Sequence, residues 1–228
     1  MTSRRDQTDF ESLGELGRAL GDVPVFPLPN AVLFPRALLP LHIFEPRYRA
    51  MIAHCLATHR ALVVARVADE RDRDDAGRPR FAHVAGLGFI VEHKALPDGR
   101  SNILLQGRAR VSLEEIPSGD PFRRVRATVL ADVPSRVREV DRTSLVGAAS
   151  SFASELHKHA DFSFDLPAET DEGAIADLCA QHLLFDPAVR QAVLEERDVA
   201  LRVRKVTAEL AMQQRALAHQ GKTGSELN

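Results

Sequence analysis

Aromatic side chains are scarce in this sequence of 228 residues. Tryptophan is absent, Tyr48 is the single tyrosine, and aromatic residues make up 5% of the chain. Few flat side chains are therefore available for stacking on exposed bases or sugars. The formal net charge of -2 also provides no global basic field that would draw the chain to nucleic acid or to an anionic membrane.

Cysteine is equally rare, and Cys55 and Cys179 each lie within an apolar helical pattern. A chain of this length can bury a core without covalent cross-links, so we interpret both residues as buried thiols rather than as a disulfide or a nucleophile. No apolar run is long enough to span a bilayer, and the polar start of the chain, Met1 to Asp9, does not have the pattern of a signal peptide. These absences predict a cytoplasmic protein without a membrane partner.

Motifs for catalysis or cofactor binding are missing as well. No Gly-x-Ser-x-Gly turn occurs, and no lysine stands in a context that suggests burial beside a serine. The segment 221–223 (Gly-Lys-Thr) resembles the end of a phosphate-binding loop, but Ala216 stands where that loop needs glycine. His157, His159 and Asp161 diverge on a helix and would not converge on one metal ion. We therefore predict no enzyme activity, no cofactor and no metal site.

The first half of the chain has the texture of a β structure. Residues 23–30 mix strand-forming residues with prolines, which predicts a strand at the edge or opening of a sheet, because proline donates no ladder hydrogen bond. A second short strand is predicted at 37–41, a helix starting at Pro46, and a buried strand at 61–67. The charged segment 69–80 predicts a solvated loop, to which the sequence assigns no function.

The clearest β signal is a hairpin around the turn Pro97-Asp98-Gly99. Alternation predicts one buried parity on each strand of this hairpin and on the strand that follows. The predicted inward residues are Leu87, Phe89, Val91, Ile103, Leu105, Ala109, Val111, Leu113, Val125, Ala127, Val129 and Ala131. Gly107 lies on the inward parity and predicts a bulge or a close approach of another backbone segment.

After Pro134 the apolar period changes from two residues to about 3.6, which predicts helices. The expected helical segments are 138–159, 171–184, 187–195 and 198–219. Asp186 followed by Pro187 is a clear helix start. The fold class is therefore α+β, with a small antiparallel barrel or half-barrel followed by a helical bundle. The expected domains are a leader at 1–21, the barrel at 22–133, the bundle at 134–219 and a disordered tail at 220–228.

One stretch carries a family resemblance. Residues 23–52 read VPVFPLPNAVLFPRALLPLHIFEPRYRAMI, and this closely resembles the opening of the Lon protease amino-terminal domain, especially its free-standing bacterial relatives. The shared pattern is Pro27-Leu28 and, after five residues, Phe34-Pro35, followed by Leu-x-Ile-Phe-Glu-x-Arg-Tyr from Leu41 to Tyr48. The hairpin at 86–116 and, less specifically, the helices at 174–210 resemble the same family. The resemblance covers roughly residues 22–212, and it does not include the leader or the charged loop.

The resemblance implies a PUA-like pseudo-barrel with one packed helix, followed by a helical bundle. In full-length Lon proteases this region helps to recognise and hold polypeptide substrates, while the ATPase and the serine–lysine peptidase lie further along the chain. The family motif contains no catalytic group. Glu45, Arg47 and Tyr48 are interpreted as fixing the helix start and packing it on the barrel, in preference to contacting a ligand.

The leading hypothesis is a non-catalytic module that binds unfolded or extended polypeptides, with an adaptor role beside a separate protease or chaperone as one form of it. Proline-interrupted edge segments leave backbone groups and apolar side chains that an extended peptide can satisfy. The predicted peptide-binding residues are Leu33, Phe34, Pro35, Leu38, Leu39 and His42. The alternative for this run is burial as the segment that closes the barrel, and the sequence leaves the two open. It also leaves the oligomeric state open.

A second hypothesis from another class is RNA binding by the PUA-like barrel. Neighbouring strands place several arginines on their predicted outer face, which could contact a phosphate backbone. These residues are Arg108, Arg110, Arg124 and Arg126. Nearby glutamates, the small net charge and the lack of an aromatic platform favour a solvated strand face instead, so nucleic acid is the less favoured partner.

Overall fold

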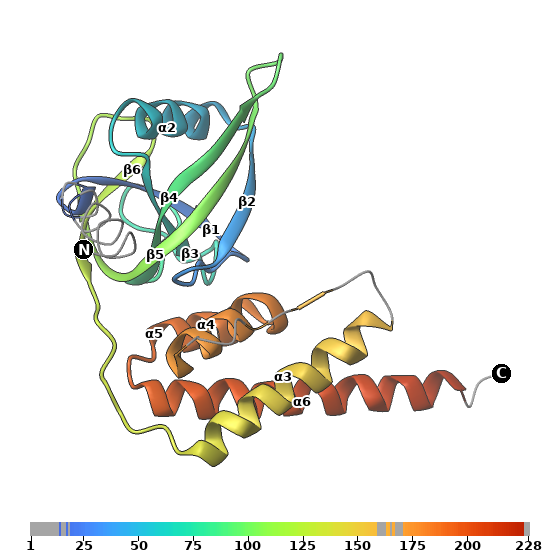
Figure 1. The fold of residues 1–228 in the computed structure, drawn as a ribbon. Coiled ribbons are helices and arrows are strands. Elements are labelled where there is room, and N and C mark those ends of the chain that lie inside the picture. Colours follow the sequence, from blue (N-terminus) through green and yellow to red (C-terminus); the bar gives the residue numbers. More distant parts are fainter. Residues whose placement is uncertain are drawn as a thin grey trace, which may run out of the picture. The chain divides into compact units, whose positions relative to one another are not determined.

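The computed structural model of the chain divides into two compact units, one up to Leu130 and the other from Ala131 onward. Each unit is described by itself (Figure 1). The structure describes residues 14, 17, 19–158, 163, 164, 166 and 171–225, with side chains up to residue 217. Most of the predicted leader at 1–21, together with His159 and Asp161, lies outside the described residues.

The first unit is built on a ring of five strands. These are β1 (Val23–Leu28), β3 (Ala61–Arg66), β4 (Val84–Ala95), β5 (Ser101–Ile116) and β6 (Arg123–Val129). The strands pair in the order β5-β4-β3-β1-β6, and β6 returns to pair with the end of β5, so the sheet closes on itself. Closure removes edges from these strands, as expected for a PUA-like pseudo-barrel. The predicted α+β class with a β pseudo-barrel and a helical bundle is confirmed.

Two separate cores line the two faces of this sheet. Val25, Val63 and Leu87 belong to a core inside the ring, whereas Leu62, Val64 and Leu105 belong to a second core on its outer side. The strand β3 is buried on both faces for this reason, which explains its uninterrupted apolar sequence.

A register shift in the β4–β5 hairpin determines which residues of β5 face the outer core and which face the ring interior. Leu87 pairs with Ala109 and Gly88 with Gly107, so Arg108 is left between the paired positions. Leu105 before the shift faces the outer core, and Ala109 after it faces the ring interior. The inward parity predicted for residues 103–113 is confirmed as buried, but these residues serve two cores rather than one. A bulge reverses the facing of the residues that follow it.

Three inward predictions are wrong because the strands change course or end. Val91 is exposed while Ile90 is buried, since a second register shift lies between Ile90 and Glu92. Val129 and Ala131 are exposed because β6 ends at Val129. The predicted turn is confirmed: Gly99 has φ of +79° and donates its amide to the Leu96 carbonyl at 3.0 Å.

The proline-containing strand β1, predicted at the edge or opening of a sheet, is not an edge strand, because it lies between β3 and β6. The ladder to β6 covers Val23–Val25 and the ladder to β3 covers Val25–Leu28, so they overlap only at Val25. Pro24 and Pro27 therefore each lie beside one partner strand, where a missing backbone donor is tolerated.

The strand β2 (Leu38–Ile43) does lie at an edge, because among the described strands it pairs with β5 alone. Its pairs run from Leu38 opposite Gln106 to Ile43 opposite Ser101. The helix α2 (Pro46–Ala57) follows, begins at proline as predicted, and buries Tyr48, Met51, Ile52 and Cys55 against the outer core.

The second unit contains α3 (Glu139–His157), α4 (Glu172–Leu183), α5 (Pro187–Glu195) and α6 (Val199–Ser225). The predicted bounds agree closely, except that α6 extends past the expected end near His219. The carboxylate of Asp186 caps α5 by accepting from the Ala188 amide at 2.7 Å. In the part of the chain that the structure describes, no helix combines the length and apolar character that crossing a membrane requires.

A fully buried arginine organises this unit and was not singled out from the sequence. The guanidinium of Arg202 on α6 lies 2.9 Å from the Asp132 carboxylate and 3.2 Å from that of Asp177 on α4. It also donates to the Glu196 carbonyl at 2.9 Å. A charge of this kind is tolerated in a core only with such partners, and losing one partner costs several kcal/mol, roughly 3–5.

Candidate polypeptide-binding surface

The predicted binding run separates into a covered half and an exposed half. Leu33 and Phe34 are 0% exposed, and Pro35 is half-buried, so the prediction that Leu33 and Phe34 offer side chains to a peptide is wrong for the folded chain. Leu38 is 45% exposed, Leu39 is half-buried and His42 is exposed. For the first half, the alternative of a buried closing segment is the one that the structure supports.

Two glycines of the barrel allow the backbone of the covered half to lie directly against the sheet. A Cβ atom at Gly86 would overlap the Leu33 carbonyl, and one at Gly107 would overlap the Phe34 carbonyl. Two backbone hydrogen bonds accompany this contact, from the Arg36 amide to the Gly107 carbonyl at 2.9 Å and from the Gly107 amide to the Ala37 carbonyl at 2.8 Å. The close backbone approach predicted at Gly107 is confirmed, and its partner is the run itself.

The exposed half presents one face of the edge strand β2. Leu38, Pro40 and His42 alternate outward, while Ile43 points into the outer core. Next along the chain, Phe44 is 59% exposed. The imidazole Nδ1 of His42 lies 2.6 Å from the side-chain oxygen of Asn102 on β5, within hydrogen-bonding distance. This surface therefore combines apolar side chains with a strand that pairs on one side only.

Most of the predicted arginine face is neutralised. Arg124 contacts the carboxylates of Asp22 and Asp120, the latter at 2.9 Å, and Arg126 contacts Glu114 at 3.0 Å. Arg110, expected on an outer face, is 3% exposed, and Arg108 is exposed. The ion pairs of Arg124 and Arg126 agree with the alternative of a solvated strand face rather than with a phosphate-binding one.

The burial of Arg110 follows from the strand register. Arg110 pairs with Gly86, and cross-strand partners share a face of the sheet. That face is covered at Gly86 by Leu33, as the overlap with a Cβ there shows. The register shift at Arg108 places Arg110 beneath the covered half, which simple alternation could not predict.

The Glu45, Arg47 and Tyr48 motif surrounds the first turn of α2. The Glu45 carbonyl accepts from the amides of Tyr48 and Arg49, and the Arg47 guanidinium lies 2.8 Å from the Glu45 carboxylate. Arg47 also lies over the Tyr48 ring at 4.5 Å, and that ring packs against Phe26 at 4.3 Å between centroids. Burial raises the pKa of the Tyr48 hydroxyl. These contacts agree with a role in fixing the helix start.

The charged segment 69–80 is more ordered than the sequence indicates. Its ends approach through a bridge between Arg73 and Pro79, and Gly77 adopts φ of +74° at the turn. The Arg78 backbone amide, with help from its side chain, lowers the pKa of Asp74 to about 2. Asp74 three residues before Gly77 is a turn pattern that could have identified this hairpin from the sequence.

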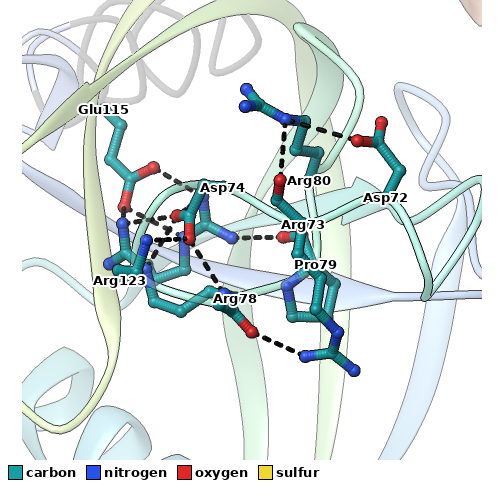
Figure 2. A network of polar contacts seen from close by, with 10 residues as sticks. Asp72, Arg73, Asp74, Arg78, Pro79, Arg80, Glu115 and Arg123 are labelled. Atoms are coloured by element: carbon teal, nitrogen blue, oxygen red, sulfur yellow. Dashed lines mark hydrogen bonds and ion pairs between the residues drawn. The ribbon is translucent and has the colours of Figure 1, made fainter.

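An ion-pair network fastens this hairpin to the barrel (Figure 2). Arg123 on β6 pairs with Glu115 on β5 and donates to the Pro79 carbonyl at 2.6 Å. Arg78 reaches the same Glu115 carboxylate at 3.0 Å. The Arg123 guanidinium lies 4.2 Å from the centroid of the Phe81 ring. A loop to which the sequence assigned no function therefore forms a fixed wall of the barrel surface.

Cys55 and Cys179 are both buried free thiols, as the sequence predicts. Burial raises the pKa of Cys55 and of Cys179 to about 12, so both thiols are protonated near neutral pH and are weak nucleophiles. No cluster of three metal-ligating side chains occurs in the described ranges.

A closed β ring with an edge strand, a packed helix and a following helical unit defines a PUA-like α+β protein. Residues 22–212 match the family described as the ATP-dependent protease La (LON) substrate-binding domain. Since this match covers most of the chain, the protein belongs to that family. The resemblance inferred from residues 23–52 is confirmed.

Several curated relatives are full-length proteases. The chain is 22% identical to the Lon protease of Desulfosudis oleivorans over 89% of its length, and 29% identical to the Lon protease of Roseiflexus castenholzii over 90%. It is 29% identical to Lon protease 2 of Sorangium cellulosum over 84%. The chain spans only 25%, 26% and 24% of these relatives, respectively, so their proteolytic activity does not transfer with the match.

Solved structures show the same fold. The N-terminal domain of the Mycobacterium avium complex Lon protease superposes with a TM-score of 0.60 at 16% identity, covering 83% of this chain and 98% of that one. The Lon N-terminal domain protein from Xanthomonas campestris also gives 0.60, at 20% identity, covering 82% of this chain and 97% of that one.

Proposed function

We propose that the protein is a non-catalytic polypeptide-binding module that captures unfolded or extended segments. The observation that carries the proposal is the exposed half of the apolar run, a one-sided edge strand in a member of a substrate-binding family. An extended peptide can pair with such a strand and cover its apolar side chains. A role as an adaptor that presents clients to a separate protease or chaperone in the cytoplasm is the cellular form of this proposal.

The binding residues that we retain are Leu38, Leu39 and His42, to which the structure adds Phe44. Leu33 and Phe34 are buried, so we do not retain them as contacts of a client. Covering Leu38 and Phe44 removes apolar area from water, and each such side chain contributes on the order of 1–2 kcal/mol to binding. Pro40 within the strand limits how many ladder hydrogen bonds a peptide can form, so side-chain contacts carry much of the affinity.

The test is binding of reduced, carboxymethylated α-lactalbumin, an unfolded protein, measured by fluorescence anisotropy. Leu38→Gln is expected to weaken binding by roughly fivefold to tenfold, because it removes about one apolar side chain from the contact. Leu201→Gln is the matched control, since Leu201 is 47% exposed on α6 in the other unit. Absence of binding by the unaltered protein, or an equal loss in both variants, would contradict the proposal.

A further inference from the structure

The first unit also contains a cavity that does not include the edge strand β2. A cavity of about 730 Å³ lies between the start of α2, the hairpin 69–80 and the segment that joins β5 to β6. Leu38, Leu39 and His42 are not among the residues that line it. Its volume falls within the range of ligand-binding clefts, roughly 300–1,000 Å³.

The floor of the cavity is apolar and well supported. Tyr48 and Phe122 line it, and both side chains are mostly buried. Tyr48 packs on Phe26 of the barrel, and Phe122 contacts His54 of α2 at 5.6 Å between ring centroids. Rigid aromatic anchors with supported rings are the usual centre of a binding site, because little conformational entropy is lost on contact.

One wall of the cavity is the ion-paired hairpin shown in Figure 2. Arg78 and Arg123 line the cavity, but both guanidiniums are engaged by Glu115, as described above. Arg124 also lines it and is paired with Asp120 at 2.9 Å. These three arginines hold the wall in place, and their charges are compensated within the protein.

Arg73 differs from these arginines. It lines the cavity, and among the described residues its guanidinium donates to the Gly77 carbonyl at 2.7 Å without a carboxylate within ion-pair distance. Glu70, on the same hairpin, also lines the cavity, and among the described residues no side-chain nitrogen of Lys, Arg or His lies within ion-pair distance of its carboxylate. The wall thus offers an uncompensated cation and an uncompensated acceptor above an apolar floor.

We propose that this cavity binds a short extended peptide segment in which an acidic side chain lies next to an apolar one. The apolar side chain rests on Tyr48 and Phe122, and the carboxylate contacts Arg73. The backbone amides and carbonyls of the segment suit a wall that supplies both acceptors, such as Glu70, and guanidinium donors. A phosphate-rich ligand fits less well than a single carboxylate, because the excess positive charge of the lining is small. Five arginines (Arg47, Arg73, Arg78, Arg123 and Arg124) and four carboxylates (Glu45, Glu70, Glu115 and Asp120) line the cavity, which leaves a net charge of +1.

This inference rests on the proposed function and specifies a second contact of the client. The probe is a short labelled peptide with two leucines beside one aspartate, capped at both ends, compared with its asparagine twin. The aspartate peptide is expected to bind about tenfold more tightly, as one charge-assisted hydrogen bond allows. Arg73→Gln is expected to abolish this preference and to leave the affinity for the asparagine twin unchanged.

Arg71→Gln is the matched control, because Arg71 carries the same charge on the same hairpin without lining the cavity. Amide shifts of the isotope-labelled protein locate the bound peptide, and they are expected at Tyr48, Arg73 and Phe122. A third peptide, with the asparagine and a free C-terminal carboxylate, tests whether a chain end can supply the charge. Binding of that peptide at Arg73 in preference to the aspartate peptide would overturn the proposal.

The outcomes separate this proposal from the proposed function. If both capped peptides bind equally, if Arg71→Gln acts like Arg73→Gln, or if the shifts map to β2 instead, the cavity proposal is wrong while polypeptide binding stands. If neither the peptides nor the unfolded protein bind, both proposals are wrong. A preference for aspartate that depends on Arg73 alone, with shifts around the cavity, supports both.

Discussion

Residues 32–37 and residues 38–44 are similarly apolar in sequence, yet the barrel covers the first segment and leaves the second along its edge. The two segments differ in the part of the barrel that each one contacts. Gly86 and Gly107 allow the backbone of the first segment to approach the sheet, and its apolar side chains are buried, with Leu33 in the outer core. The second segment becomes a strand that pairs with β5, and alternation then turns every second side chain outward. The close approach that Gly86 and Gly107 allow, rather than a difference in hydrophobicity, therefore separates the buried segment from the exposed one.

The largest expected effect compares two phenylalanines, one in each segment. Phe34→Ala should lower the free energy of unfolding by roughly 3–5 kcal/mol, because Phe34 is fully buried and its truncation leaves a cavity. Phe44→Ala should cost about 0.5 kcal/mol, since that side chain is mostly in water. Urea unfolding followed by circular dichroism measures both. Similar losses in the two variants would mean that the covered and exposed halves are not distinct.

A smaller loss of stability is expected from substitution of Gly107, where the backbone of the covered half lies against the sheet. Gly107→Ala should destabilise the protein by roughly 1–3 kcal/mol, because the added methyl group displaces the backbone at Phe34. Gly119→Ala is the control, since a Cβ there meets no atom within 4 Å. The same urea titration applies. A Gly107→Ala variant as stable as the control would show that the close approach is not required.

The smallest effect is a change in thiol reactivity. Both thiols have folded pKa values of about 12, so labelling with a thiol reagent near pH 8 should be slow in the native protein. Leu33→Ala should speed labelling of Cys55 about tenfold, because both side chains belong to the outer core, and leave Cys179 unchanged. Mass spectrometry of the labelled peptides distinguishes the two sites. Equal acceleration at both cysteines would indicate global unfolding instead.

The same thiols give a pH dependence with a definite sign. In the unfolded chain a thiol ionises near its ordinary pKa, whereas burial keeps it protonated in the folded chain up to about 12. The unfolded state therefore loses protons first, and the free energy of unfolding falls as pH rises from about 9 toward 12. Replacing both cysteines by alanine should flatten this part of the stability curve.

The fold could be predicted from the sequence far better than the binding surface. Helix starts such as Asp186-Pro187 and the Pro97-Asp98-Gly99 turn are local signals and appear where expected, as do most of the apolar parities. The errors at Val91, Arg110 and β1 share a cause, because register shifts and strand order depend on partners distant in sequence. The cavity was missed for the same reason, since its wall combines the hairpin 69–80 with Glu115 and Arg123.

The sequence by itself determined the α+β class, the order of most elements and the family, because periodicity, turn chemistry and a contiguous motif are all encoded locally. Only the tertiary structure decided which half of the apolar run is covered and which arginines remain unpaired. Burial and ion pairing depend on what the folded chain brings alongside, and a linear pattern specifies a side chain's chemistry without specifying its neighbours.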